Sequence, residues 1–260
     1  MSAERMPTLF IGHGNPMNAI VPGPYGDAWT RLAGELPRPR SILAVSAHWF
    51  VPGTRVTAQE RPRTLHDFGG FPRELSQVQY PAPGSPALAR RVGELLGPTE
   101  VALDERWGLD HGTWSVLVHM FPSADVPVVQ LSIDETLTAV EHGRLARGLR
   151  ALRDEGVLVL GSGNVVHNLH AYAWGRHPVD PYDWGVRFEA RMREHLIARD
   201  FAAVARYEEL GSDATLSAPT PEHFLPLVYA VAPCDADEPV SFPVEGFDGG
   251  SISMLAVRIG

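Results

Sequence analysis

The sequence contains little cysteine, little basic charge and no long apolar run. Cys234 is the only cysteine among 260 residues, which excludes an intrachain disulfide and a cysteine-ligated iron–sulfur cluster. The 22 Lys and Arg are outnumbered by 31 Asp and Glu, and this net charge of −9 argues against binding to nucleic acid or to an anionic membrane. No apolar run approaches the ~20 residues of a membrane-spanning helix. The first residues, 1–7, lack the layout of a signal peptide, so we expect a cytoplasmic protein.

The composition is that of a globular protein, with 44% hydrophobic and 20% charged residues. Solidly apolar segments alternate with amphipathic ones, which is typical of an open sheet covered by helices on both faces. No internal repeat and no linker divides the chain. We therefore predict an α/β fold in which residues 1–260 form a single catalytic domain around a central, mostly parallel sheet. The sequence does not indicate an oligomeric state.

The spacing of apolar residues predicts the individual elements. The expected strands are a run from Thr8 that stops before His13, followed by 41–47, 126–133, 157–160 and 251–259. The expected helices are 25–36, 85–97, 115–120, 135–155, 182–200, 201–210 and 220–231. Between them, residues 49–84 are rich in Pro, Gly and Arg, and we expect them to form an irregular cover over a functional site.

Histidines stand at or just beyond the carboxyl ends of three expected strands. They are His13, His48 and His167. In open α/β sheets the ligand crevice lies beyond the carboxyl ends of the strands, so this repeated placement predicts a shared site at that edge. Any one of these histidines alone is more typical of a structural residue than of a ligand. The repetition is what favours a site.

His223 joins this set for a separate reason. Thr220 and Pro221 are helix-start residues, which places His223 in the expected first turn, where the positive end of the helix dipole disfavours imidazolium. A neutral imidazole is the form that binds a metal. His66 and His111, in glycine-rich loops, are weaker candidates for the same crevice. The other histidines are expected to be peripheral: His119, His142, His170, His177 and His195.

A cluster of imidazoles with a neighbouring carboxylate suits Zn(II) or Fe(II) rather than Ca²⁺ or Mg²⁺. The ligand types do not choose between zinc-dependent hydrolysis and iron–oxygen chemistry. Other catalytic patterns fit less well, because Gly161-Ser162-Gly163 lacks the spacing of a nucleophile elbow. Neither a phosphate-binding loop nor a dinucleotide-binding fingerprint is present.

Eight ordered motifs span nearly the whole chain, from about Met6 to the C-terminal strand. They are LFIGHGNPMN, SAHWF, HDFGGFP, YPAPGSP, DHGTWS, QLSID, GSGNVVHNL and PTPEHFLPL. In this combination the chain resembles the class III extradiol ring-cleaving dioxygenases, and most of all their 4,5-DOPA extradiol branch. The resemblance implies one non-haem Fe(II), a catechol-type substrate and O2. Both oxygen atoms would enter the substrate, and the ring would open to a muconic semialdehyde.

The resemblance also implies roles for individual residues. His13 and His48 match the two N-terminal metal ligands of the family, and His223 matches its C-terminal ligand. Better-known relatives use two histidines and a carboxylate, so either His223 or the adjacent Glu222 completes the set, and we favour His223. His167 matches the acid/base histidine and is a further potential ligand, particularly for Zn(II), when no substrate is bound.

The remaining expectations concern the walls of the site. His111 is a candidate second acid/base, and His66, Phe68 and Trp49 are candidate substrate-binding residues. Two alternatives stay open: a zinc-dependent hydrolase with Glu222 as general base, and a non-catalytic binding protein that retains the fold. Zn(II) is also expected as an adventitious occupant of purified protein, since it stands above iron in the order of metal affinities.

Overall fold

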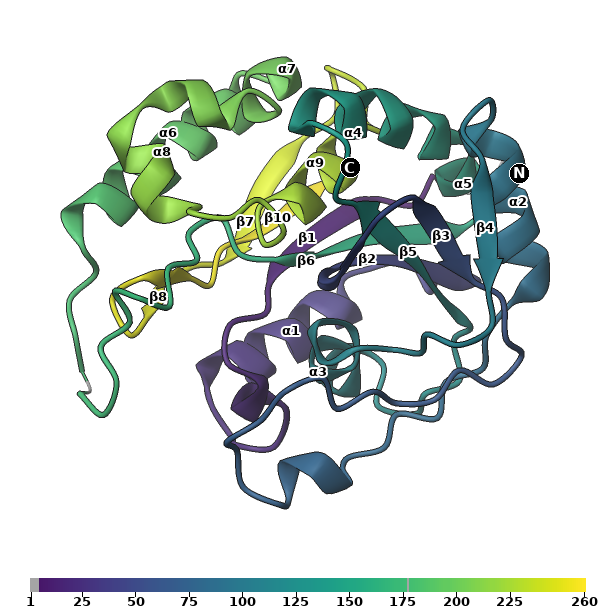
Figure 1. Cartoon of the computed structure of the whole chain (residues 1–260), viewed down its shortest axis with the longest axis horizontal. Helices are drawn as coiled ribbons and strands as arrows, with labels where there is room; N and C mark the ends of the chain where they lie inside the picture. Colours follow the sequence, from purple (N-terminus) through teal and green to yellow (C-terminus); the bar gives the residue numbers. More distant parts are fainter. Residues whose placement is uncertain (1–4, 177) are drawn as a thin grey trace.

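The structure is a computed structural model that describes residues 5–176 and 178–260, and a large sheet runs through its centre (Figure 1). The strand order is β4-β3-β5-β2-β6-β1-β10-β7. These strands are β1 (Thr8–Gly12), β2 (Ser41–Val51), β3 (Thr54–Thr57), β4 (Val101–Asp104), β5 (Val128–Asp134), β6 (Val157–Gly163), β7 (Val240–Val244) and β10 (Ala256–Ile259). The central strands β5, β2, β6 and β1 run parallel, whereas β3 against β5, and β10 against β1 and β7, pair antiparallel.

Helices cover both faces of the sheet, as Figure 1 shows. Their bounds are α1 (Pro24–Gly34), α2 (Pro86–Leu96), α3 (His111–Met120), α4 (Ala139–Ala146), α5 (Arg150–Asp154), α6 (Asp183–Ile197), α7 (Phe201–Val204), α8 (Ser212–Ser217) and α9 (Leu225–Val231). Helices α1 and α3 pack on one face and most of the others on the opposite face. The predicted α/β class with a mostly parallel central sheet is confirmed.

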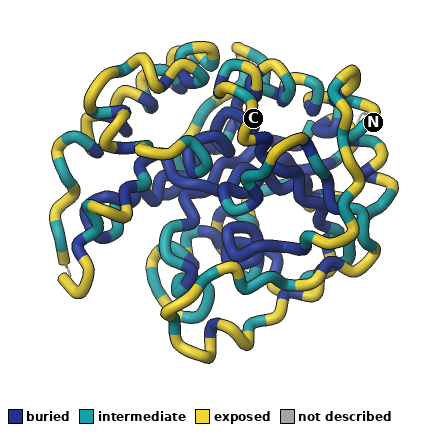
Figure 2. The backbone as a smooth tube through the Cα atoms, viewed as in Figure 1, coloured by how far each residue is buried: buried dark blue, intermediate teal, exposed yellow. Residues whose placement is uncertain are grey.

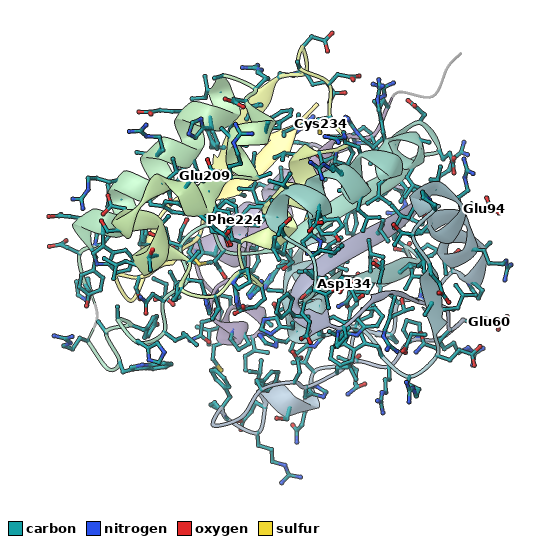
Figure 3. The ribbon with its side chains drawn as sticks, turned by 45° about the horizontal axis from the view of Figure 1, so that its top comes forward. Glu60, Glu94, Asp134, Glu209, Phe224 and Cys234 are labelled. Carbon is teal, nitrogen blue, oxygen red and sulfur yellow. The ribbon has the colours of Figure 1, made fainter. Side chains whose placement is uncertain are left out.

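Successive side chains of each strand point to opposite faces of the sheet, and this alternation produces two hydrophobic cores. In β1, Leu9 and Ile11 belong to the core beneath α1 and α3, and Phe10 belongs to the core on the other face. This division follows from the two-residue period of strand side chains. The central strands β1, β5 and β6 are accordingly buried along their whole length, whereas the edge strands β4 and β7 are partly exposed, and most other exposed residues lie on helices and loops (Figure 2). Glu60 and Glu94 lie at the outside of the molecule, whereas Phe224 is buried (Figure 3).

Several elements differ from the sequence-based expectation. β2 extends to Val51, and its register against β5 shifts between Val45 and Phe50, so His48 lies within an irregular part of the strand rather than after its end. The expected cover contributes β3 at its start. The expected helix 135–155 begins only at Ala139, because Thr138 and Glu141 form a capping box. Strands β4 and β7 and the helix α8 were not predicted.

A small hairpin follows β7 and lies outside the main sheet. It consists of β8 (Phe247–Asp248) and β9 (Ile252–Ser253), which pair antiparallel. An isolated antiparallel bridge joins Ile252 to His167. The hairpin is therefore fixed to the segment that follows β6, at the carboxyl end of the parallel strands.

Two expectations about histidines are wrong. His223 does not lie in the first turn of a helix, because α9 begins at Leu225 and the preceding residues form a turn closed by the Phe224 N–H and the Pro221 carbonyl. His142 is not peripheral, since it is completely buried and its Nδ1 lies 2.8 Å from the Tyr229 hydroxyl. His177 lies outside the described residues. In the part of the chain that the structure describes, no helix is both long and apolar enough to cross a membrane.

Candidate metal centre and its pocket

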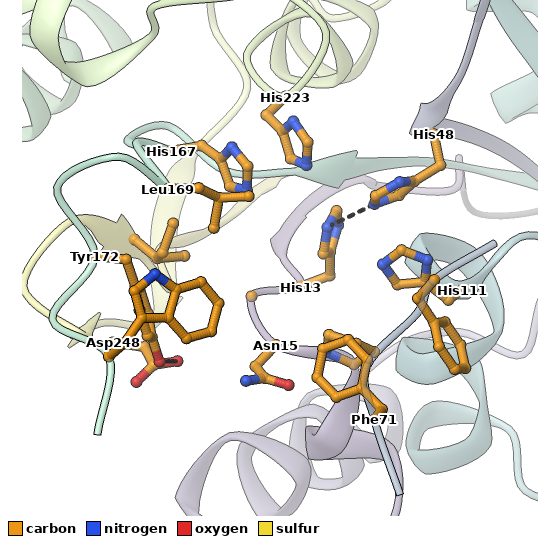
Figure 4. A pocket seen from close by; sticks show the side chains of 15 residues that line it. His13, Asn15, His48, Phe71, His111, His167, Leu169, Tyr172, His223 and Asp248 are labelled. Carbon is orange, nitrogen blue, oxygen red and sulfur yellow. Dashed lines mark hydrogen bonds between the residues drawn. The ribbon is translucent and has the colours of Figure 1, made fainter. Parts of the chain in front are cut away.

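A cavity of about 240 Å³ opens at the carboxyl edge of the parallel strands (Figure 4). Five histidines from separate segments of the chain line it: His13, His48, His111, His167 and His223. Phe68 and Phe71 contribute from the long loop after β3. The prediction that strand-end histidines meet at one edge of the sheet is therefore confirmed by their positions.

His13 follows β1 directly, and its ring is oriented by a serine. Its Nδ1 lies 3.0 Å from the Ser162 Oγ, and that hydroxyl donates to the Gly112 carbonyl at 2.5 Å. Because the single hydroxyl proton of Ser162 is used in this way, Nδ1 of His13 is the donor in the first bond. The lone pair of His13 Nε2 consequently faces the cavity.

The glycines on either side of His13 allow the chain to pack closely against residues 253 and 254. A Cβ on Gly12 would lie 2.7 Å from the Ser253 carbonyl oxygen and 2.9 Å from the Met254 Cα. Gly14 has a φ of +59°, which favours glycine, and a Cβ there would meet the Met254 Sδ at 2.4 Å. Close approach to residues 253 and 254 therefore requires glycine at both positions.

Asp67 orients two of the cavity histidines. Its Oδ2 lies 3.0 Å from His111 Nδ1 and 3.5 Å from His48 Nδ1, and its Oδ1 accepts the His111 backbone N–H at 2.9 Å. The hydrogen bond to His111 lowers the pKa of Asp67 although its burial acts in the opposite direction. An ionised Asp67 draws the Nδ1 protons of both rings and leaves their Nε2 atoms for other partners.

His223 is oriented by the residue before it. Its Nδ1 lies 3.2 Å from Glu222 Oε1, which also accepts the Thr220 hydroxyl at 2.7 Å. Glu222 therefore lies behind His223 as its hydrogen-bond acceptor, and the carboxylate is directed at Nδ1 rather than into the cavity.

One ring nitrogen from each of His13, His48 and His223 lies within 4.8 Å of the other two. The Nε2 atoms of His13 and His48 are 3.2 Å apart (Figure 4). Each ring presents its Nδ1 to an oxygen acceptor, an arrangement that fixes the tautomer and ring orientation of metal-ligating histidines. Three converging nitrogen donors suit a divalent transition metal such as Zn(II) or Fe(II), so these residues fit a metal.

The electrostatics of the cavity favour neutral imidazoles. Burial, reinforced by the neighbouring histidines, lowers the pKa of His13 and of His223 well below the usual value. Burial likewise lowers the pKa of His48 to about 3 and that of His167 to about 4. Neutral imidazole is the form that coordinates a metal or accepts a proton.

His167 lies beside this group without belonging to it. Its ring stacks on that of His223, with centroids 3.4 Å apart and planes inclined by 4°. Among the described residues, the clusters with metal-binding geometry are His13, His48 and His223, and His48, Asp67 and His111. His167 is absent from both, and its ring faces the cavity next to the converging nitrogens.

The expected aromatic walls are only partly present. Phe68 lines the cavity and contacts His111 edge-to-face, with ring centroids 5.5 Å apart. His66 lies behind Phe68, where its Nε2 donates to the Val78 carbonyl at 2.9 Å. Trp49 does not reach the cavity: successive strand side chains point to opposite faces, and Trp49 instead stacks on Trp107.

Other lining residues were not predicted from the sequence. They are Asn15, Leu169, Tyr172, Trp174, Asp248 and Ile252. Asn15 stands two residues after His13 in the GHGNP motif, which was a usable signal. Asp248 lies on the β8–β9 hairpin and gave no sequence signal, because tertiary contacts such as the bridge between His167 and Ile252 bring that hairpin to the cavity.

Comparison with known proteins agrees with this geometry. Residues 20–252 match a family model described as the catalytic LigB subunit of aromatic ring-opening dioxygenase. A protein of Escherichia coli K12 named 4,5-DOPA dioxygenase extradiol is 51% identical, covering 100% of this chain and 97% of that protein. A protein of the same name from Beta vulgaris is 36% identical, covering 95% and 93% of the two chains.

A solved structure shows the same architecture. The crystal structure of an uncharacterized protein from Escherichia coli K12 superposes with a TM-score of 0.86 at 48% identity, covering 98% of this chain and 100% of that one. The fold, the histidine-lined cavity and the full-length relatives lead to one conclusion. The chain belongs to the LigB family of catalytic subunits of aromatic ring-opening dioxygenases, the class III extradiol dioxygenases.

Proposed function

We propose that this protein is a non-haem Fe(II) extradiol dioxygenase that inserts both atoms of O2 into a DOPA-like catechol and opens the ring to a muconic semialdehyde. The observation that carries the proposal is the convergence of His13, His48 and His223, whose ring nitrogens lie within 4.8 Å of one another. The names of the relatives from Escherichia coli and Beta vulgaris support a catechol substrate. The cytoplasmic location stays a prediction from the sequence.

His13, His48 and His223 would hold the iron through their Nε2 atoms. Bound Fe(II) would supply a centre that holds both catechol oxygens and O2 and passes electrons from the ring to oxygen. Ser162 and Glu222 accept hydrogen bonds from the Nδ1 atoms of His13 and His223, and Asp67 Oδ2 lies 3.5 Å from Nδ1 of His48. These acceptors hold the three rings in the orientation that coordination requires and raise their basicity.

His167 is the proposed proton shuttle. Burial lowers its pKa to about 4, so the imidazole is neutral at working pH, with a ring nitrogen that can accept a proton from a catechol hydroxyl. The same lowering makes the protonated ring a strong acid that gives the proton back readily. Because His167 lines the cavity beside His223, the imidazolium would face the bound substrate and would return the proton to an oxygen atom during ring opening. The stack on His223 fixes the ring in the required position.

His111 is proposed as a second acid/base or as a hydrogen-bonding partner of the substrate. Asp67 accepts from Nδ1 of His111 at 3.0 Å, so its Nε2 is free to accept a substrate proton. A carboxylate in this place stabilises the imidazolium that results. Phe68 and Phe71 would cover the aromatic ring and exclude water.

A zinc-dependent hydrolase is the weaker alternative. That mechanism needs a general base beside metal-bound water, and Glu222 was the candidate. Its Oε1 is occupied by His223 Nδ1 and the Thr220 hydroxyl, which points the carboxylate away from such a water. Zn(II) nevertheless fits the same nitrogens as an adventitious occupant.

The direct test is anaerobic reconstitution with Fe(II), addition of a catechol such as DOPA, and admission of air. Oxygen uptake with formation of a yellow ring-opened product is the expected result. Ester or amide hydrolysis supported by Zn(II), without oxygen uptake across a panel of catechols, would favour the hydrolase. Catechol binding without either reaction would indicate a non-catalytic binding protein.

A further inference from the structure

The charged side chains around the cavity are of one sign. Among the described residues that line it, Asp248 is the only carboxylate, and none is Lys or Arg. Among the side chains that the structure describes around the cavity, Asp248 is therefore the one that carries a fixed charge.

Asp248 lies across the cavity from the phenylalanine wall. Figure 4 shows Asp248 and Tyr172 on one side, and His111 and Phe71 on the other. The Tyr172 hydroxyl donates to Asp248 Oδ2 at 2.9 Å. In the described part of the chain, Oδ1 of Asp248 has no hydrogen-bond partner, so it remains available to a ligand donor.

Close packing and hydrogen bonds fix the position of Asp248. A Cβ on Gly249 would lie 2.1 Å from the Tyr172 ring, so glycine is needed for this close packing. Burial, with the nearby charge of Asp248, raises the pKa of Tyr172 to about 12, so its hydroxyl stays protonated as the donor. The Ala173 N–H also donates to the Gly249 carbonyl at 3.0 Å.

Aromatic rings flank the same carboxylate. The rings of Tyr172 and Trp174 have centroids 4.5 Å apart, and both residues line the cavity. An ammonium group is attracted both to a carboxylate and to the faces of aromatic rings. A carboxylate on the substrate would meet no Lys or Arg here, since none lines the cavity in the part of the chain that the structure describes.

From this arrangement we infer that Asp248 is a specificity-determining residue that binds the ammonium group on the side chain of a catecholic amine. The inference rests on the proposed function, in which the catechol oxygens occupy the histidine end of the cavity. Under this inference the protein recognises the amine of the substrate side chain, and it does not need the carboxylate that an amino acid such as DOPA also carries. Dopamine should therefore bind at least as tightly as DOPA, and catechol acids should bind poorly.

The test uses binding to the Zn(II)-loaded, full-length protein under anaerobic conditions, where catechols are not consumed. Calorimetry would compare dopamine, 4-ethylcatechol and 3-(3,4-dihydroxyphenyl)propionate, which differ in the charge of the side chain. We expect dopamine to bind about tenfold to a hundredfold more tightly than 4-ethylcatechol, as for a charge-assisted hydrogen bond. The propionate should bind most weakly of the three.

Variants then assign this preference to one residue. Asp248→Asn should bring the Kd ratio of dopamine to 4-ethylcatechol close to one, and Asp248→Lys should reverse the order in favour of the propionate. Asp237→Asn is the matched control, because it makes the same charge change at an exposed position outside the cavity. Its Kd ratio should equal that of the unmodified protein.

The outcomes separate this inference from the proposed function. Binding of 4-ethylcatechol without any preference for dopamine overturns the role of Asp248 alone, as does a preference that survives Asp248→Asn. Failure of all three ligands to bind overturns the catechol function and the inference together. Circular dichroism of each variant confirms that a changed ratio does not arise from unfolding.

Discussion

His167 and His223 lie face to face, with ring centroids 3.4 Å apart and ring planes inclined by only 4°. Glu222 holds Nδ1 of His223 at 3.2 Å, so the other nitrogen of that ring is directed at His13 and His48. His167 has no such acceptor among the described contacts. We therefore propose different roles for the two stacked rings, with His223 as metal ligand and His167 as proton carrier.

The first prediction tests this division through metal content. His13→Ala and His48→Ala should each remove most bound Fe(II), because only two of three nitrogen donors remain. His167→Ala should keep most of the iron yet reduce kcat about 100-fold or more, as expected for loss of an acid/base. Elemental analysis beside turnover measurement checks both, with the exposed His170→Ala as control. Equal iron loss in His167→Ala and His13→Ala would show that His167 is a ligand.

A second prediction concerns Asp67, which accepts hydrogen bonds from His111 and lies 3.5 Å from Nδ1 of His48. Asp67→Asn removes the charge that fixes the two Nδ1 protons, so both rings lose their enforced tautomer. Fe(II) affinity should fall about tenfold to a hundredfold, the usual effect of removing such a partner, and kcat should fall as well. Metal titration and steady-state kinetics measure the two effects, and Asp237→Asn serves as control. Unchanged affinity would mean that Asp67 does not orient His48.

The close approach of β1 to residues 253 and 254 gives a third prediction. In Gly12→Ala the new Cβ would meet backbone atoms of Ser253 and Met254 at 2.7–2.9 Å, and backbone cannot move aside as a flexible side chain can. We expect the free energy of unfolding in urea to fall by about 1–3 kcal/mol, as for overpacked interiors. Gly34→Ala is the control, since its Cβ would meet nothing within 4 Å. Equal stability of the two variants would contradict the packing argument.

The buried His142 predicts a dependence of stability on pH. Burial lowers its pKa to about 4 in the folded protein, whereas the unfolded chain holds the proton up to the ordinary value of 6.5. Between these values the unfolded state binds more protons, so stability is lost as the pH falls from 6.5 toward 4.

Chemical denaturation across this range should show that His142→Phe loses stability less steeply than the parent protein. The difference in slope should not exceed about 1.4 kcal/mol per pH unit, the limit for one proton. The slope is the informative quantity, because the substitution also removes the hydrogen bond between His142 and Tyr229. Parallel slopes in the two proteins would show that His142 does not titrate in this way.

The sequence allowed the sheet and much of the site to be predicted for a physical reason. Parallel strands end at one edge, so histidines after different strands, such as His13 and His167, had to lie near one another. Helix-start signals were less reliable for His223. It was expected in the first turn of a helix, but it lies in a turn before α9. The prediction that Trp49 binds substrate was wrong in its geometry. The neighbouring His48 side chain points into the cavity, so the Trp49 side chain points to the other face of β2.

The residues that no pattern predicted depend on tertiary contacts. Asp67 belongs to the long loop, and its contacts with His111 and His48 place it beneath the cavity. Asp248 reaches the cavity through a hairpin that bridges to His167 from about 80 positions further along the chain. Periodicity describes how a segment packs, but it does not specify which distant segment it meets.

The central claim is that both atoms of one O2 molecule enter the catechol at the His13, His48 and His223 site. Reaction of the Fe(II)-reconstituted protein with DOPA under ¹⁸O2, followed by rapid mass spectrometry of the ring-opened product, tests it most directly. We predict two ¹⁸O atoms in each product molecule, with no product from His13→Ala. A product that takes its oxygen from water, or a His13→Ala variant with full activity, would contradict it.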